Sequence, residues 1–207
     1  LPIIDAFPDA YQMDQLVTGG STSDDGSGVK EVHYSFDQSS WTKTSGTTSW
    51  YKTIAIDDGG ANLAEGDHTL YVRATDRAGN VSTVASRTFT VDRNNPEVSV
   101  EAAYDGTVYR NAAFTIDGTI TDTLALGASP VTVAVDGPSG AVDLSGDPLS
   151  YDADGADNTL GTADDGSWSQ SVPITDGDGS YTVTITGTDQ VGRNSEVTRT
   201  VQVDTAP

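Results

Sequence analysis

Aspartate side chains are the residues of this chain with the clearest capacity for chemistry. The 207 residues include 31 acidic side chains against 10 lysines and arginines, and 26 of the acids are aspartate. Calcium takes six to eight hard oxygen ligands, and acidic loops supply them without the histidine or cysteine that transition metals prefer. Four oxygen-bearing side chains are expected to lie close together where two repeats meet: Asp92, Asn94, Asp122 and Asp189. This set predicts a calcium site.

Two further acidic groups are candidate metal ligands. The first repeat carries the equivalent loop residues Asp24, Asp25 and Asp76. A segment without counterpart in the first repeat carries Asp152, Asp154, Asp157, Asp164 and Asp165. It is not an EF-hand, because Gly155 comes too early and no glutamate closes the loop. For the loop residues the alternative is that each aspartate caps its own turn. For the inserted segment the alternative is a solvated acidic loop.

Composition excludes several classes of function. With a formal net charge of −21 and only 10 basic residues, the chain lacks the cations that bind nucleic acid or anionic membrane surfaces. No apolar run approaches the length of a membrane span, so no membrane insertion is expected. There is no cysteine, which removes thiolate metal sites and cysteine nucleophiles. The only histidines, His33 and His68, stand outside any catalytic motif, so we expect no enzyme activity.

Short alternating segments must position these side chains. Val32, Tyr34 and Phe36 alternate with polar residues, as expected for a strand with one buried face. Asp-Gly, a strong turn signal, recurs nine times between such segments. No segment keeps the apolar spacing of a helix. The chain is therefore predicted to be all-β.

Internal repetition divides the chain into two modules. The segment 70–79 returns 113 residues later as 183–192, and Ser49-Trp50 returns 118 residues later as Ser167-Trp168. With prolines marking the junctions, the modules span 1–95 and 96–207 and should form an extended pair. The growing offset places an acidic insertion at about 144–166, which we expect to protrude and add nothing to the core.

Each module should form a seven-stranded Greek-key sandwich of immunoglobulin-like or fibronectin-like type. In the first module the strands are expected at 3–7, 16–22, 29–36, 41–44, 50–56, 68–75 and 86–91. Tyr181 stands where a tyrosine corner opens a strand, and the aligned residue is His68. Trp50 and Trp168 are equivalent, which favours packing over sugar binding, whereas Trp41 is open to either role.

The sandwich topology explains why the acidic loops should meet. The loops after the second and sixth strands lie at the pole beside the preceding linker. In the second module these loops carry Asp122 and Asp189, and the linker carries Asp92 and Asn94. A bound calcium ion would tie the linker to both loops and stiffen the junction.

Several motifs of the first module resemble a known family. The segments 23–29 (Ser-Asp-Asp-Gly-Ser-Gly-Val), 74–82 (Ala-Thr-Asp-Arg-Ala-Gly-Asn-Val-Ser) and 89–92 (Phe-Thr-Val-Asp) resemble bacterial immunoglobulin-like repeat domains. The second module matches less well, since Gly192-Arg193-Asn194 interrupts the pattern.

The resemblance implies tandem modules of a large bacterial protein that is secreted or held at the cell surface. It implies a non-enzymatic spacer or adhesin stalk, whose partners are neighbouring modules of the same chain and a glycan or a host or cell-surface protein. Two alternatives remain: a carbohydrate-binding or accessory module of a secreted polysaccharide-active enzyme, and a building block of a surface layer.

Overall fold

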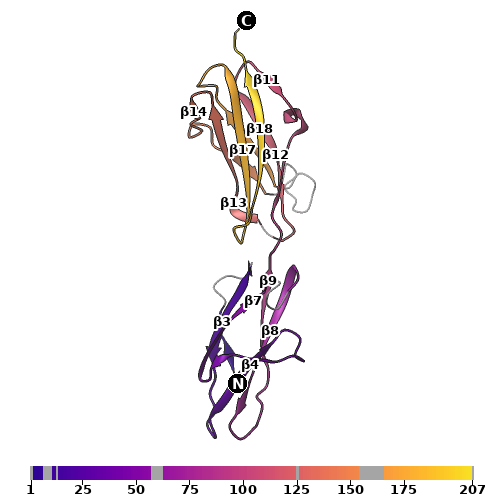
Figure 1. The fold of residues 1–207 in the computed structure, drawn as a ribbon, viewed down its shortest axis with the longest axis vertical. Coiled ribbons are helices and arrows are strands. Elements are labelled where there is room, and N and C mark those ends of the chain that lie inside the picture. The colour runs from indigo at the N-terminus through magenta and orange to yellow at the C-terminus, as the bar shows by residue number, and fades with distance from the viewer. Residues whose placement is uncertain are drawn as a thin grey trace. The chain divides into compact units, whose positions relative to one another are not determined.

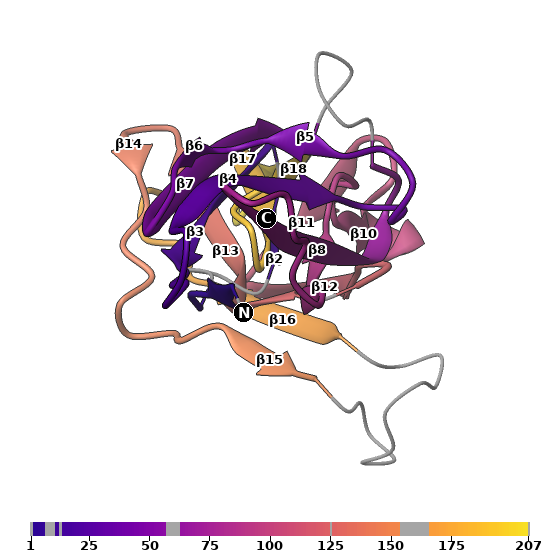
Figure 2. The same cartoon turned by 90° about the horizontal axis from the view of Figure 1, so that it is seen from below.

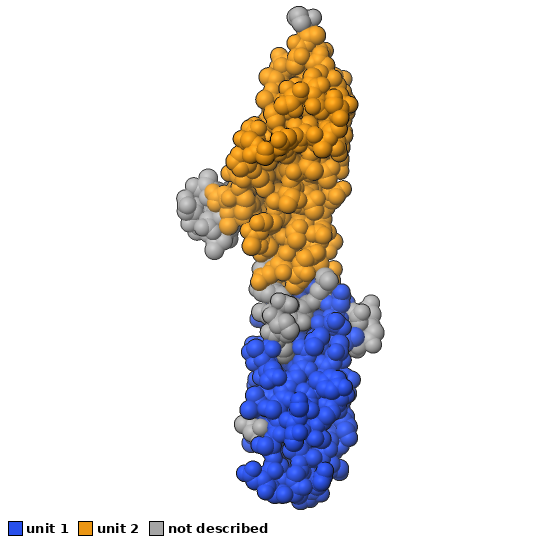
Figure 3. Space-filling model, turned by 90° about the vertical axis from the view of Figure 1, so that its left-hand side faces the viewer, with its two compact units in different colours: residues 1–93 blue, residues 94–207 orange. Residues whose placement is uncertain are grey.

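The computed structural model describes residues 2–6, 11–12, 14–56, 63–124, 126–153 and 166–206. The chain divides into two compact units, Leu1–Arg93 and Asn94–Pro207, which are coloured separately in Figure 3. Each unit has its own hydrophobic core.

The first unit is built from two sheets (Figure 1). One has the order β1-β3-β7-β6, formed by Ile3–Ile4, Gln15–Ser21, Ser49–Ala55 and Ser45–Gly46. The other has the order β2-β9-β8-β4-β5, formed by Tyr11–Gln12, Ala85–Val91, Gly66–Asp76, Val29–Ser35 and Thr42–Lys43. These strands fall within a few residues of the predicted ones.

The second unit repeats this plan. One sheet has the order β10-β12-β16-β15, formed by Glu97–Val100, Phe114–Thr121, Ser167–Val172 and Ser150–Asp152. The other has the order β11-β18-β17-β13-β14, formed by Val108–Arg110, Asn194–Val203, Gly179–Asp189, Leu126–Gly137 and Gly140–Ala141. A single 3-10 turn, η1 (Ala102–Tyr104), is the only helical segment among the described residues. The prediction of two all-β sandwiches is confirmed.

The cores follow from strand alternation. Along β17 every second residue is buried, and Tyr181, Val183 and Ile185 are fully enclosed. Trp50 and Trp168 are 1% and 2% exposed at equivalent places, which confirms their packing role. Each indole lies over a glycine of the paired strand, Gly20 or Gly118, where a Cβ atom would come within 2.9 Å of Cζ2. Only glycine fits below the ring.

The first strand of each module differs from the prediction. It is divided into two short pieces that join different sheets: β1 pairs antiparallel with β3, and β2 pairs parallel with β9. The second unit does the same, with β10 on β12 and β11 parallel to β18. The first strand thus crosses between sheets, and strands of two to four residues are too short for alternation to indicate this.

The insertion was predicted wrongly in its first part. Val142 is buried in the core, and Leu144, Leu149 and Tyr151 pack against it. Strand β15 pairs with β16, and the two lie side by side in Figure 2. These apolar side chains bury surface that the sandwich would otherwise expose, so residues 142–152 belong to the domain rather than to a protrusion.

Candidate cation site and the other predicted residues

Asp189 combines a structural cap with a buried charge. It ends strand β17, and its Oδ1 accepts hydrogen bonds from the backbone N–H groups of Val191 (2.9 Å) and Arg193 (2.8 Å). The residue is 2% exposed, and its Oδ2 is buried with no hydrogen-bond partner among the described residues. Turn capping therefore explains one oxygen of this carboxylate and leaves the other unexplained.

The two carboxylate oxygens of Asp122 differ in the same way. It follows strand β12, and its Oδ1 accepts a hydrogen bond from the backbone N–H of Leu124 (2.8 Å). Its Oδ2 is also buried and has no hydrogen-bond partner in the described part of the chain. Because Leu126 pairs in register with Asp189, both aspartates stand at the same end of the second unit.

The linker residues are placed as follows. The side chain of Asn94 donates a hydrogen bond from Nδ2 to Oγ1 of Thr123 (3.2 Å), which attaches residue 94 to the loop that carries Asp122. Asp92 is fully buried in the first unit, directly after β9. Within the described ranges, no three or more His, Cys, Asp or Glu side chains are grouped closely enough to hold a metal ion. A cation at Asp122 and Asp189 would therefore need amide, carbonyl or water oxygens as well.

The loops of the first unit also lie together, as the topology predicts. Asp24 and Asp76 line one open cavity of about 240 Å³ together with Asn80. The two loops are joined by a hydrogen bond from the N–H of Arg77 to the carbonyl of Gly28 (3.0 Å).

Both carboxylates of this cavity are used as caps. Oδ2 of Asp24 accepts from the N–H groups of Gly26 and Gly28, and Asp76 accepts from the side chain and the backbone N–H of Asn80. The Asn80 side chain is the main reason that the pKa of Asp76 lies below its usual value. Asp25 is exposed in the same loop. The turn-cap interpretation thus accounts for Asp24 and Asp76.

The acidic insertion is only partly described. Asp152 is the exposed last residue of β15. The other four candidates, Asp154, Asp157, Asp164 and Asp165, lie outside the described residues.

The remaining candidates have structural surroundings. The guanidinium of Arg73 lies 4.0 Å above the ring of Trp41, and the indole N–H of Trp41 donates to the carbonyl of Gln38 (3.0 Å). His33 lies between Arg73 and Lys43 on neighbouring strands, and burial lowers its pKa. The ring of His68 makes a hydrogen bond to the backbone carbonyl of Ala64, as expected for a corner residue.

Two family models match adjoining parts of the sequence. Residues 18–93 match the bacterial Ig-like domain, and residues 96–205, more than half of the chain, match glucodextranase domain B. The search of curated proteins returned no match. Among the described residues, no helix is long and apolar enough to cross a membrane.

Two solved structures align with nearly the whole chain. The chain aligns over its whole length with 65% of a structure from a 1.5-MDa bacterial ice-binding adhesin, at 20% identity and a TM-score of 0.52. It aligns over 99% of its length with 94% of the fibronectin(III)-like modules of Clostridium thermocellum CbhA, at 14% identity and a TM-score of 0.47. With the family matches and the two sandwiches together, the chain belongs to the glucodextranase domain B family, with a bacterial Ig-like domain preceding that domain.

Proposed function

We propose that the two modules are non-catalytic structural repeats of a larger exported bacterial protein, where they act as a spacer or adhesin stalk stiffened by calcium. The family matches and the sandwich folds support a structural or adhesive module. The two histidines of the sequence stand outside any catalytic motif, and both have structural surroundings.

The buried Oδ2 of Asp189 is the observation that carries the calcium part of the proposal. Enclosing a carboxylate oxygen without a partner costs several kcal/mol unless a cation or a donor compensates it. Asp122 offers a second such oxygen at the same end of the unit. Asn94 donates through Nδ2 to the loop that carries Asp122, and its Oδ1 is the third oxygen that we propose as a ligand. Hard oxygen ligands in a strongly acidic chain favour Ca²⁺ over transition metals.

Thermal unfolding of the full chain in calcium and in chelator, at equal ionic strength, tests the binding. At a free calcium concentration about a hundred times the dissociation constant, the folded state gains roughly 2.7 kcal/mol, so the melting temperature should rise. Magnesium should do much less, because it demands near-octahedral geometry. The substitution Asp189→Asn keeps an oxygen for the turn but removes the charge, and it should abolish the calcium effect.

Asp143 provides the matched control. Its Oδ1 also caps a turn, accepting from the N–H of Ser145 (2.9 Å), but the residue is exposed. Asp143→Asn should leave the calcium effect intact. If the wild-type chain melts identically with and without millimolar calcium, Asp122 and Asp189 are turn caps only. Small-angle scattering tests the stiffening separately, since calcium should narrow the distribution of shapes.

A second candidate function is that of an accessory or carbohydrate-binding module of a secreted polysaccharide-active enzyme. The match of residues 96–205 to a domain named after glucodextranase favours it. Trp41 is the aromatic residue for such binding, although Arg73 already covers one face of its ring. Binding on a glycan array that is lost in Trp41→Ala would support this function, and a flat array would support the spacer.

A further inference from the structure

An open cleft of about 580 Å³ lies on the side of the first unit, between the end of β4 and strand β7. We call it the side cleft. Its apolar lining comprises Tyr34, Phe36, Ile54 and Leu63, and Asp37 and Lys52 are among its polar residues. The rings of Tyr34 and Phe36 meet edge to face at 5.9 Å. The cleft therefore offers an apolar floor with charged groups at hand, as ligand-binding clefts do.

The edge of strand β7 is open beside this cleft. Strand β6 pairs only with Trp50 and Tyr51, so among the described residues no strand continues it along residues 52–55. An edge strand presents unpaired backbone N–H and C=O groups, which are a template for another extended chain.

The second unit shows what fills the equivalent place. Strand β13 carries Val133 and Val135 at the positions of Tyr34 and Phe36, because Val133 pairs with Ile185 as Tyr34 pairs with Val72. There the segment 142–149 crosses from one sheet to the other, and it turns at 144–147, where the N–H of Asp147 donates to the carbonyl of Leu144 (3.0 Å). It buries Val142 and packs Leu144 and Leu149 against the core.

A polar contact fixes this segment as well. Gln170 of β16 donates from Nε2 to the backbone carbonyl of Asp147 (2.6 Å). The residue equivalent to Gln170, at the repeat offset of 118, is Lys52, which lines the side cleft. Lys52 is thus a donor placed where the second unit uses a donor to hold a peptide carbonyl.

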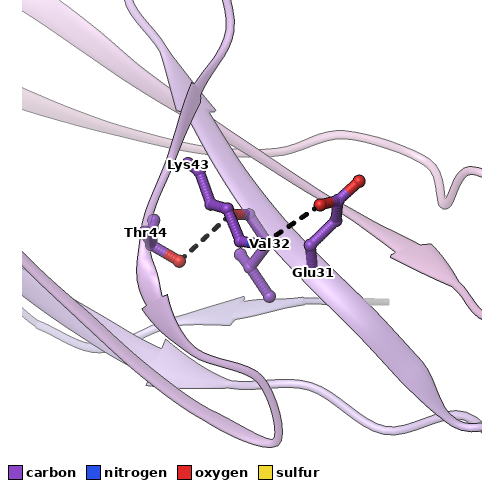
Figure 4. Close-up of polar contacts among 4 residues, drawn as sticks. All are labelled: Glu31, Val32, Lys43 and Thr44. Carbon is purple, nitrogen blue, oxygen red and sulfur yellow. Dashed lines mark hydrogen bonds and ion pairs between the residues drawn. The ribbon is translucent and has the colours of Figure 1, made fainter.

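The level at which the chain crosses explains why the first unit leaves this place open. Its crossing is made by Thr44 alone, whose N–H and hydroxyl both donate to the carbonyl of Val32 (2.9 and 3.1 Å), as Figure 4 shows for the hydroxyl. In the second unit the N–H of Val142 donates instead to the carbonyl of Val135 (2.8 Å). The residue of the first unit at the position of Val135 is Phe36. The crossings differ by four strand residues, about 13 Å at 3.3 Å per residue. The early crossing leaves Tyr34 and Phe36 only half-buried, with the rest of each ring facing the side cleft.

We propose that the side cleft binds an extended segment of another polypeptide, which adds along β7 and inserts aliphatic side chains at alternate positions. Such β-strand addition draws affinity from main-chain hydrogen bonds and specificity from pockets for alternate side chains. Residues 142–144 are the pattern for the extended part of this ligand, because they precede the turn and place Val142 and Leu144, two residues apart, against the core. Lys52 supplies the donor for a backbone carbonyl.

A nuclear magnetic resonance titration of the full chain with a synthetic peptide of residues 141–150 tests the proposal. Amide shifts should concentrate at residues 34–37 and 52–55 and saturate with a dissociation constant below a few millimolar. A control peptide with serine in place of Val142, Leu144 and Leu149 should shift these amides at least tenfold more weakly. Shifts that are absent, or equal for the two peptides, would overturn the proposal.

Variants of the chain sharpen the result. Phe36→Ser should weaken the binding at least tenfold, and Tyr51→Ser should not, because Tyr51 is exposed on β7 and does not line the cleft. The wild-type shift map decides the question even if Phe36→Ser fails to fold. Two other occupants would also contradict the proposal. One is an oligosaccharide that shifts the same amides when the peptide does not. The other is the chain's own segment 57–62, if the peptide binds only after that segment is replaced by glycine and serine.

Discussion

His68 and Tyr181 make the same hydrogen bond in the two units. Nε2 of His68 donates to the carbonyl of Ala64 (2.7 Å), and the hydroxyl of Tyr181 donates to the carbonyl of Gly177 (3.0 Å), each four residues upstream. Tyr181 also accepts from the N–H of Asp176 (3.3 Å). The tyrosine corner predicted for the second module is therefore confirmed, and a histidine performs its role in the first.

Removing the hydroxyl of Tyr181 should destabilise the second unit. Tyr181→Phe leaves the carbonyl of Gly177 without this donor, which should cost about 1 kcal/mol of unfolding free energy. Chemical denaturation measures the loss. Tyr109→Phe, at a residue 71% exposed, is the control and should have no effect. Equal losses in both variants would show that the corner bond contributes nothing.

Acid should weaken the first unit through His33. Burial is the main cause of its lowered pKa; the charge of Glu31 opposes this shift, and Arg73 and Lys43 add to it. The unfolded chain therefore binds a proton more readily than the folded one. Stability is complete above the unfolded pKa of about 6.5 and falls as the pH drops toward the lower folded pKa. The melting temperature should decrease between pH 7.5 and 5.5.

Two variants separate His33 from the other histidine. His33→Gln should flatten the pH dependence in this window. His68→Tyr, which replaces the corner histidine by the residue found at position 181, should retain it. If the pH dependence persists in His33→Gln and disappears in His68→Tyr, then His68 causes it and the prediction for His33 is wrong.

The strands could be predicted from the sequence because their signal is local. Alternation of the kind seen in Val32, Tyr34 and Phe36, together with Asp-Gly turns, located most strands to within a few residues. The strand predicted at 3–7 contains β1, but the two-residue strand β2 on the other sheet was missed, since such a short segment has no period to detect. The side cleft was missed as well, because it depends on where Thr44 crosses between sheets.

The site residues were predictable only in part for a similar reason. Topology placed Asp122 and Asp189 at one end of the second unit, and it placed Asp24 beside Asp76. Sequence could not show which carboxylate oxygens would be occupied by turns. That distinction depends on side-chain burial, and it separates Asp189, with a buried free oxygen, from Asp76, whose two oxygens both accept from Asn80.

The segment 142–149 provides the last prediction. Leu144 and Leu149 lie five residues apart among polar neighbours, so no periodicity marked them, yet both pack against the core. Leu144→Ser with Leu149→Ser should lower the unfolding free energy of the second unit by roughly 2 kcal/mol, at the low end of large-to-small core changes because both are only half-buried. Hydrogen exchange of the β17 amides measures the change in this unit alone.

Shortening the chain beyond this segment is the matched comparison. Replacing residues 154–165 by a short Gly-Ser connection removes Asp154, Asp157, Asp164 and Asp165 but keeps every apolar residue of 142–152. Loop-closure entropy changes slowly with length, so exchange at β17 should change by less than about 1 kcal/mol. The opposite ranking, with the shortened chain unfolding and the leucine variant unchanged, would mean that the acidic residues support the domain. It would also remove the pattern on which peptide binding at the side cleft is argued, because 142–149 would then not be held by its leucines.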